Sequence, residues 1–448
     1  MFLGLRRWWA RLFTEAEAPD SRNEGNAQPV GGAASYAAAQ AAPVVGSRCP
    51  LISSQGEIAG FEFRLGQDLQ RRLCRRGERS AMLAHSRAVL ASAQMVSQSG
   101  RIGLARLPAD CVVHLLGEEV VQGVWIAIDR SECDPATTPD FAQGLHDALL
   151  HLRSQGAKLA WEVETGEGLN MLPDFVLARQ GKQPMFTLLA TLAALPPKLR
   201  PLPTLCTDIA AFEDLELALQ SGVDYICGAL APTGSGADSG QTVSVSPEVG
   251  RIGQLLHQIV TGAETEAIVA NIKSDVGLSY RLLQRLKTAN LAHLEAGTSI
   301  DAAVLLLGRD ELYRWLSLLL FQFAGKRRVS SALQEVALWR SHLMEGLARE
   351  QHEEAPALLF TLGLASMMSP ILKISVQDVI STLHLHPHAE QALLAHAGPW
   401  QPYLALVTLL EMQELDPCPV LDHFGGAEHV TALSDEAWQW AWTASHAS

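Results

Sequence analysis

The 448-residue sequence has no hydrophobic run long enough to cross a bilayer, and it shows no signal peptide. Its seven cysteines are scattered, odd in number and without a C-x-x-C pair, which favours reduced thiols in a cytoplasmic protein over a disulfide or zinc framework. Positive charge is also scarce, because 34 Lys and Arg residues stand against 48 Asp and Glu residues, a net charge of −14. Such a surface repels a phosphate backbone, which argues against nonspecific nucleic-acid binding.

The residues that are present describe a globular protein with large cores. Hydrophobic residues make up 48% of the chain and charged residues 18%. A chain of 448 residues exceeds what a single core usually fills, so we expect two domains. Shifts in composition predict five segments: an amphipathic segment at 1–13, a linker at 14–46, a first domain at 47–230, a second linker at 231–247 and a second domain at 248–448.

The first 13 residues, MFLGLRRWWARLF, combine aromatic and basic side chains on a short amphipathic helix. This pattern suits weak association with an anionic membrane surface or docking to a partner. It equally suits a frayed terminus, since one short helix without a second anchor binds weakly. Residues 14–46 are rich in Ala, Gly, Ser, Pro and Gln and lack an apolar period, so they predict a flexible linker.

The first domain alternates strand-like and helix-like segments. VWIAIDR and KLAWEVE have the composition of buried strands, and DFAQGLHDALLHLRSQG between them has that of an amphipathic helix. Repeated alternation of this kind predicts a parallel sheet covered by helices, and the number of units suits a (β/α) barrel. A site in such a barrel lies at the C-terminal ends of its strands.

The second domain follows a Gly/Ser-rich joint and is expected to be entirely helical. Ile300, Ala303, Val304 and Leu307 repeat at the period of a core-facing helix. Gly308 then predicts the end of that helix in a left-handed cap, before another apolar stripe begins.

These helical sequences resemble a known module. DVGLSYRLLQRLKTAN, followed by SIDAAVLLLGRDELYRWLSLLLF, looks like the HDOD domain of bacterial signalling proteins. The resemblance implies an all-helical relative of the HD metal-dependent phosphohydrolases that lacks their metal site. The sequence agrees with that loss, because no histidine in 248–448 is followed by aspartate. We therefore expect no HD phosphohydrolase activity.

The histidines of this domain have ordinary interpretations. His342 lies in ALWRSHLMEGLA without an acidic neighbour that would complete a metal pair, which predicts a packing role. His384, His386 and His388 alternate in LHLHPHAE, and alternating histidines can ligate a metal when the backbone is extended. Pro387 interrupts this segment, which predicts a solvated connection between two helices instead of a metal site.

The first domain is similar, more distantly, to EAL-type cyclic di-GMP phosphodiesterases. The similarity rests on GFEFRL, HLRSQGAKLAWEVE and TDIAAFEDLELALQSGVDYICGAL, and an EAL domain followed by an HDOD domain is a known pairing. The family implies strand-end carboxylates and an asparagine that hold divalent cations, which activate water for attack on the phosphodiester.

Most of the residues that this resemblance implies are missing. Glu62 retains the glutamate of the opening motif, but the arginine expected downstream falls at Gly66 or is displaced to Arg64. The strand expected to carry the asparagine reads RIGLARL and has no amide side chain. Other positions are changed as well: the next glutamate falls at Ala127, the paired aspartates at Glu162 and Val163, the lysine at Leu177 and the glutamine at Cys227.

Loss of most ligands removes the reason for a metal to bind, so the sequence predicts a pseudoenzyme with no catalytic, metal or cofactor residues. We expect it to transduce signals through unidentified partner proteins, with cyclic di-GMP as an input if the barrel has kept nucleotide affinity. The alternative is a residual phosphodiesterase with a rearranged metal set. That alternative requires four remnant carboxylates to converge at the barrel mouth: Glu62, Asp129, Glu162 and Asp208.

Overall fold

The computed structural model describes residues 48–115, 121–129, 139–161, 171–228, 230, 247–288, 299–321, 329–372, 374–412 and 419–446. The predictions for the segment 1–13, the linker 14–46 and the residue Glu162 lie outside this part of the chain, as does the second linker, 231–247, except for its last residue. Residues Ala42–Ser448 form one compact unit.

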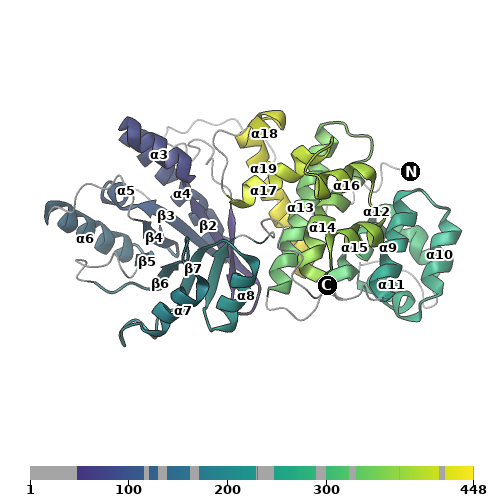
Figure 1. Cartoon of the computed structure of the whole chain (residues 1–448), viewed down its shortest axis with the longest axis horizontal. Coiled ribbons are helices and arrows are strands. Elements are labelled where there is room, and N and C mark those ends of the chain that lie inside the picture. Colours follow the sequence, from purple (N-terminus) through teal and green to yellow (C-terminus); the bar gives the residue numbers. More distant parts are fainter. Residues whose placement is uncertain are drawn as a thin grey trace, which may run out of the picture. The chain divides into compact units, whose positions relative to one another are not determined.

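The first half of this unit is a near-closed barrel of eight strands (Figure 1). The strand order is β5-β4-β3-β2-β1-β8-β7-β6, and the amide of Asp174 donates to the Leu159 carbonyl at 2.7 Å beside the remaining seam between β5 and β6. The strands are β1 (Cys49–Ser53), β2 (Ile58–Arg64), β3 (Ile102–Pro108), β4 (Trp125–Asp129), β5 (Lys158–Trp161), β6 (Val176–Arg179), β7 (Thr204–Ile209) and β8 (Tyr225–Gly228).

The barrel differs from the predicted parallel sheet at its first strand. β1 runs antiparallel to both of its neighbours, β2 and β8, whereas the other paired strands are parallel. The reason is the short connection after β1, where the Gly56 amide donates to the Ser53 carbonyl at 2.8 Å in a tight turn. A turn of this length joins antiparallel strands, while parallel strands need a longer crossover.

Helices cover the outside of the strands, as Figure 1 shows for α6, α7 and α8. The strands are short and largely buried, such as WIAID in β4, which is the pattern of a sheet covered on both faces. The helices of this half are α3 (Gln67–Arg76), α4 (Arg79–Gln98), α5 (Ala109–Val113), α6 (Pro139–Ser154), α7 (Met185–Ala193) and α8 (Phe212–Gln220).

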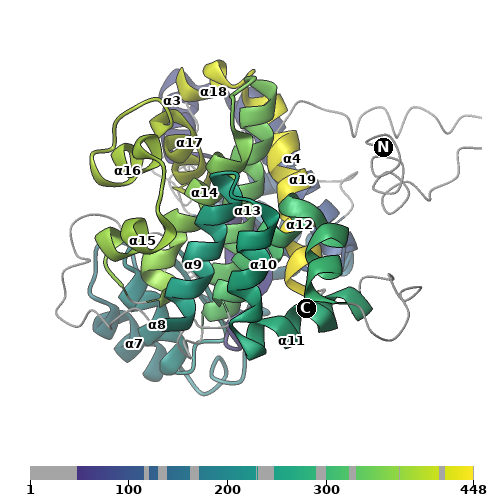
Figure 2. The same cartoon turned by 90° about the vertical axis from the view of Figure 1, so that its right-hand side faces the viewer.

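Within its described residues, the second half contains helices and no strands. Helix α13 packs against α14 and α19 (Figure 2). The helices are α9 (Pro247–Val260), α10 (Thr265–Lys273), α11 (Val276–Thr288), α12 (Ile300–Phe321), α13 (Ser330–Glu350), α14 (Pro356–Leu372), α15 (Val376–Leu383), α16 (Pro387–Leu394), α17 (Gln401–Met412), α18 (Pro419–His423) and α19 (Ala427–His446).

Two glycines shape this helical half. Gly308 interrupts α12 with φ 72° and ψ 170°, so the predicted break is present. Its ψ is extended, however, and the predicted left-handed cap is wrong. Gly363 lets α14 approach α13 closely, because a Cβ atom at this position would lie 2.6 Å from the Cα of Ser341.

Side chains cap the N-terminal ends of α15 and α16. Ser375 and Asp378 form a reciprocal capping box at the start of α15. The histidine run joins α15 to α16, as predicted, but its members also cap helices. His384 ends α15 with φ 49°, and the Nδ1 atom of His386 accepts from the His388 amide at 3.2 Å at the start of α16.

Strand β2 contacts the helical half directly. The ring of Phe61 meets Trp438 of α19 edge-on, with centroids 5.0 Å apart, and Trp438 stacks on Trp339 at 4.8 Å. Nearby, Arg101 donates to Glu335 at 2.8 Å, and the carboxylate of this pair is almost fully buried. Trp438 is buried, so α19 packs onto the core through this side chain.

Two further expectations concern cysteines and membranes. Cys74 is disulfide-bonded, so the expectation of reduced thiols throughout is wrong at this residue. No helix in the described ranges combines the length and the apolarity that a membrane crossing requires.

Candidate functional site

The barrel mouth gathers charged side chains at the C-terminal ends of the strands. Arg64, Asp129 and Arg179 are the last residues of β2, β4 and β6. Asp208 lies near the end of β7, and Arg106 lies two residues before the end of β3. Because parallel strands end at the same edge, these five side chains meet although they are far apart in the sequence.

Arg106 lies at the centre of this group, and its side chain is 3% exposed. Its Nη1 atom donates to Glu62 Oε1 at 3.2 Å and to both carboxylate oxygens of Asp208 at 3.3 Å. Its Nη2 atom donates to the Thr207 hydroxyl at 3.1 Å, and its Nε atom lies 3.7 Å from Asp129. One buried guanidinium therefore contacts three carboxylates.

Asp208 is aimed into the mouth by an irregular strand. The pairing of β7 with β8 shifts register between Cys206 and Ile209, and Asp208 has a φ of 55°. Such bulges re-aim side chains at barrel rims, and aspartate is among the few residues that tolerate this backbone conformation.

Ion pairs compensate the burial of Asp208. Arg64 donates to one of its oxygens, and the Nε atom of Arg179 lies 3.0 Å from the other. Burial alone would raise the pKa of Asp208, but Arg106, Arg64 and Arg179 together hold this pKa well below its usual range. Arg179 also donates to Asp129 at 2.9 Å.

The positive and negative charges at the barrel mouth are equal in number. Three arginines face three carboxylates, and the ion pairs connect all six residues into one network: Arg64, Arg106, Arg179, Glu62, Asp129 and Asp208. The hollow above the network has a volume of about 20 Å³, which holds roughly one water molecule. We call these six residues the arginine–carboxylate network.

This donor set does not fit the divalent cations that the EAL resemblance implies. A hard cation needs several oxygen atoms that converge on one point and are free to coordinate it. The oxygens of Glu62 and Asp208 converge instead on Arg106, and Asp129 is paired with Arg179. Arginine nitrogens carry positive charge and offer no lone pair, so they cannot complete the set.

The structure brings together three of the four predicted remnant carboxylates, Glu62, Asp129 and Asp208. The fourth, Glu162, lies outside the described residues. The positions at which the resemblance expected a glutamate, a lysine and a glutamine lie in the apolar barrel interior: Ala127, Leu177 and Cys227 pack with Leu104 and Leu205.

Sequence reasoning named Arg64 but missed the other two arginines of the network. Arg106 lies on the strand searched for an asparagine, and Arg179 ends the strand searched for a lysine. The available signal was a single basic residue in each of two otherwise apolar strands, IGLARLP in β3 and VLAR in β6. A charge in a strand buried on both faces requires a partner of opposite charge.

The histidines of the helical half do not converge as a set. His384 lies 4.7 Å from the ring of His257 on α9, whereas His386 packs at 4.8 Å against Trp400. His342 stacks on Trp440 with ring centroids 4.5 Å apart, which is the packing role predicted for it. Within the described residues, the group spaced to hold a metal is different and lies inside the barrel: Cys49, Glu62 and Cys227.

The whole chain has partial relatives among known proteins. No family model matches it. The uncharacterized protein YuxH of Bacillus subtilis is 30% identical over 171 residues, which are 38% of this chain and 42% of that protein. The cyclic di-GMP phosphodiesterase CdgJ of Vibrio cholerae is 27% identical over 175 residues, 38% of each. The matches thus span less than half of either relative.

Solved structures show the same partial likeness. An EAL domain protein from Listeria monocytogenes is 15% identical, with a TM-score of 0.31 over 41% of this chain and 85% of that one. The YkuI protein of Bacillus subtilis, solved with cyclic di-GMP and calcium, is 13% identical, with a TM-score of 0.28 over 60% and 73%. The chain is therefore similar, over part of its length, to EAL-domain proteins and to a cyclic di-GMP phosphodiesterase.

Proposed function

We propose that this chain is a non-catalytic signal-transduction protein. In this proposal an EAL-like barrel that does not hydrolyse cyclic di-GMP is joined to an HDOD-like helical region, and the pair acts through contacts with other proteins. The observation that carries the proposal is the position of Arg106, whose guanidinium contacts Glu62, Asp208 and Asp129 at the barrel mouth.

Electrostatics explains why this position opposes metal-dependent hydrolysis. Two unit charges about 4 Å apart interact by about 4 kcal/mol at an effective dielectric constant near 20. A divalent cation at that distance from Arg106 would therefore meet a repulsion of about 8 kcal/mol. The carboxylates that would attract the cation are already paired with Arg64 and Arg179.

The contacts of β2 support coupling between the two halves. Successive residues of this strand face opposite sides, so Phe61 packs on Trp438 while Glu62 points into the barrel interior and contacts Arg106. A shift of α19 caused by a partner protein would move β2, and with it one carboxylate of the network. The buried ion pair of Arg101 with Glu335 adds a polar connection beside it.

Cyclic di-GMP is the candidate input because similar proteins are described as binding it. FimX of Pseudomonas aeruginosa and YkuI of Bacillus subtilis were solved with this nucleotide. In this chain the hollow at the mouth is about 20 Å³, and its arginines are paired with carboxylates. Protein contacts are therefore the principal mode of action that we propose.

The test is calorimetric titration of cyclic di-GMP into the full chain, with and without manganese, followed by chromatography for the linear product. We expect no linear product in either case. Product formation would refute the proposal and establish the residual phosphodiesterase, which the shared location of Glu62, Asp129 and Asp208 favours. Heat of binding without product would identify the chain as a nucleotide receptor. If the titration gives no heat, the input that we infer is a contact with another protein.

A further inference from the structure

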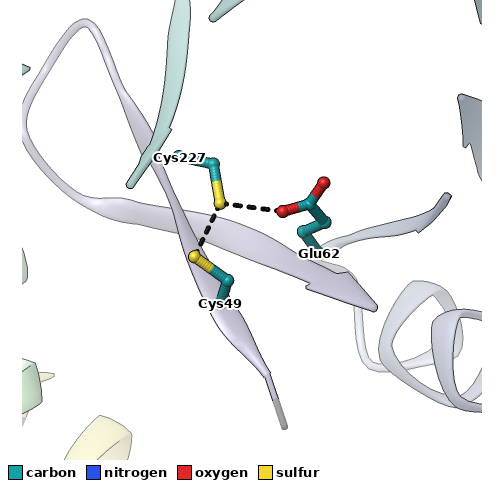
Figure 3. A group of neighbouring side chains, drawn as sticks. All are labelled: Cys49, Glu62 and Cys227. Atoms are coloured by element: carbon teal, nitrogen blue, oxygen red, sulfur yellow. Dashed lines mark hydrogen bonds between the residues drawn. The ribbon is translucent and has the colours of Figure 1, made fainter. Parts of the chain in front are cut away.

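A cluster of two thiols and a carboxylate lies inside the barrel, below the mouth (Figure 3). Cys49 is the first residue of β1, Glu62 lies on β2 and Cys227 lies on β8. Because β1 is hydrogen-bonded to both β2 and β8, the three residues come from adjacent strands. Cys49 pairs with Glu62 in register, and the pairing of Ile52 with Ile226 sets Cys227 diagonally across from Cys49.

The three side chains point toward one another, as Figure 3 shows. The Sγ atoms of Cys49 and Cys227 are 2.7 Å apart, and the Cys227 thiol lies 3.2 Å from Glu62 Oε2. Cys227 and Glu62 are each 1% exposed and Cys49 is 7% exposed, so water is nearly excluded. The other oxygen of Glu62 accepts from Arg106.

We propose that Cys49 and Cys227 are a redox-active dithiol that closes to a disulfide across β1 and β8, with Glu62 as the acceptor of the Cys227 proton. The oxidant in this proposal is a small disulfide of the glutathione class. Neither phosphodiesterase activity nor nucleotide binding is required for the proposal, so it is independent of the function proposed above.

The exchange proceeds in two balanced steps. Cys49, the more exposed residue of the two, loses its proton and attacks one sulfur of the small disulfide. The small disulfide breaks, a mixed disulfide forms, and the departing thiolate takes up the proton and leaves as a thiol. Cys227 then gives its proton to Glu62 and attacks the Cys49 sulfur, which breaks the mixed disulfide. The second small thiolate leaves and takes up the proton that Glu62 releases, so Glu62 is a carboxylate again. The protein loses two electrons and two protons, and the small disulfide becomes two thiols.

Glu62 has a defined part in the second step. Burial raises the pKa of Cys227 well above its ordinary value, and Cys49 and Glu62 raise it further. Cys227 is therefore a protonated thiol at neutral pH, whereas the attacking species must be a thiolate. The carboxylate at 3.2 Å provides the acceptor that this apolar interior otherwise lacks among its clustered residues.

A metal site is the rival interpretation of the same three residues, and the geometry favours the disulfide. Two thiolates on one tetrahedral zinc ion lie about 3.8 Å apart, given Zn–S bonds of about 2.3 Å. The observed separation of 2.7 Å is nearer to the disulfide bond length of about 2.05 Å. Structural zinc also takes four ligands, while this group supplies three.

The experiment equilibrates the full chain with reduced and oxidised glutathione at graded ratios, quenches with acid and alkylates the remaining thiols after denaturation. Cleavage before aspartate separates Cys206 from Cys227, because Asp208 and Asp224 lie between them. Mass spectrometry then identifies linked peptides. We expect a Cys49–Cys227 linked peptide whose yield rises with the oxidised fraction and falls again on reduction.

Three variants sharpen the test. Cys49→Ala and Cys227→Ala should each abolish the linked peptide, with folding checked by circular dichroism. Cys206→Ala is the matched control, because burial raises the pKa of this other barrel thiol to about 12 and its loss should leave the cross-link intact. Glu62→Gln should slow cross-linking by about 100-fold or more and change the pH dependence of its rate, because it removes the proton acceptor.

Two outcomes would overturn the proposal. One is complete alkylation of both Cys49 and Cys227 in the most oxidising mixture, under conditions in which the unfolded chain forms the cross-link. The other is one equivalent of metal that co-purifies with the chain, is detected by elemental analysis and protects both thiols until a chelator is added. The second result would assign the cluster as a metal site.

Discussion

Replacement of Arg106 tests whether the arginine–carboxylate network is the device that stabilises the barrel mouth without a metal. Arg106→Met keeps the length of the side chain and removes its charge and its donors. The carboxylates of Asp208 and Asp129 keep Arg64 and Arg179 as partners. Glu62, which is 1% exposed, loses the hydrogen bond from Arg106 Nη1.

The expected cost follows from the burial of this pair. Removal of one partner from a buried ion pair destabilises a protein by about 3–5 kcal/mol, because the remaining charge is left in a medium that solvates it poorly. The double variant Glu62→Gln/Arg106→Met removes that charge as well, so we expect it to recover about 0.5–3 kcal/mol of the loss. Urea unfolding of the full chain, followed by circular dichroism, measures both differences.

An exposed pair in the same barrel provides the control. Arg153 donates to Asp174 at 3.0 Å, but both side chains are about one-third exposed. Arg153→Met should therefore cost about 1 kcal/mol or less. If Arg106→Met is no more destabilising than Arg153→Met, or if the double variant is less stable than Arg106→Met alone, the buried network is not the stabilising element inferred here.

Three further changes test the packing. Gly363→Ala should destabilise the helical half by about 1–3 kcal/mol in urea unfolding, because the added Cβ would lie 2.6 Å from Ser341 Cα. Burial, helped by nearby arginines, lowers the pKa of His342 to about 4. The wild type should therefore lose up to about 3 kcal/mol as pH falls from 6.5 to 4, since the unfolded chain binds a proton that the folded chain does not, and His342→Phe should remove this loss. Trp438→Ala should cost about 3–5 kcal/mol and speed amide hydrogen exchange in the strand that carries Phe61; unchanged exchange there would contradict coupling through β2.

Sequence pattern predicted the parallel strands and their helices because each unit carries its own signal, a short apolar run followed by an amphipathic helix. The direction of β1 was not available from that signal. Its residues are apolar whichever way the strand runs, and only the turn after Ser53 decides the direction. The break at Gly308, by contrast, could be predicted from the sequence, because it follows from a local backbone preference of glycine.

The arginine–carboxylate network depends on pairings that no local pattern contains. Arg64 and Asp208 are 144 positions apart in the sequence, and Arg106 and Asp208 are 102 apart. Their contact requires the strand order and also the irregularity that turns Asp208 inward. The remnant carboxylates could be named from the sequence, but the cations that neutralise them could not be assigned as their partners.

Two features of this barrel act together: paired charges at the mouth and apolar side chains in the interior. The charges that remain at the mouth are satisfied by guanidinium groups, and the positions expected to bear further polar groups are apolar and packed: Ala127, Leu177 and Cys227. Removal of Arg106 would therefore free carboxylate oxygens without supplying the polar side chains that the EAL resemblance implies at these positions. Glu62 takes part in both features. One of its oxygens accepts a hydrogen bond from Arg106, and the other lies against the Cys227 thiol. A cysteine at 227 thus gives Glu62 a thiol partner, and this contact connects the proposed dithiol to the network on which the proposed non-catalytic function rests.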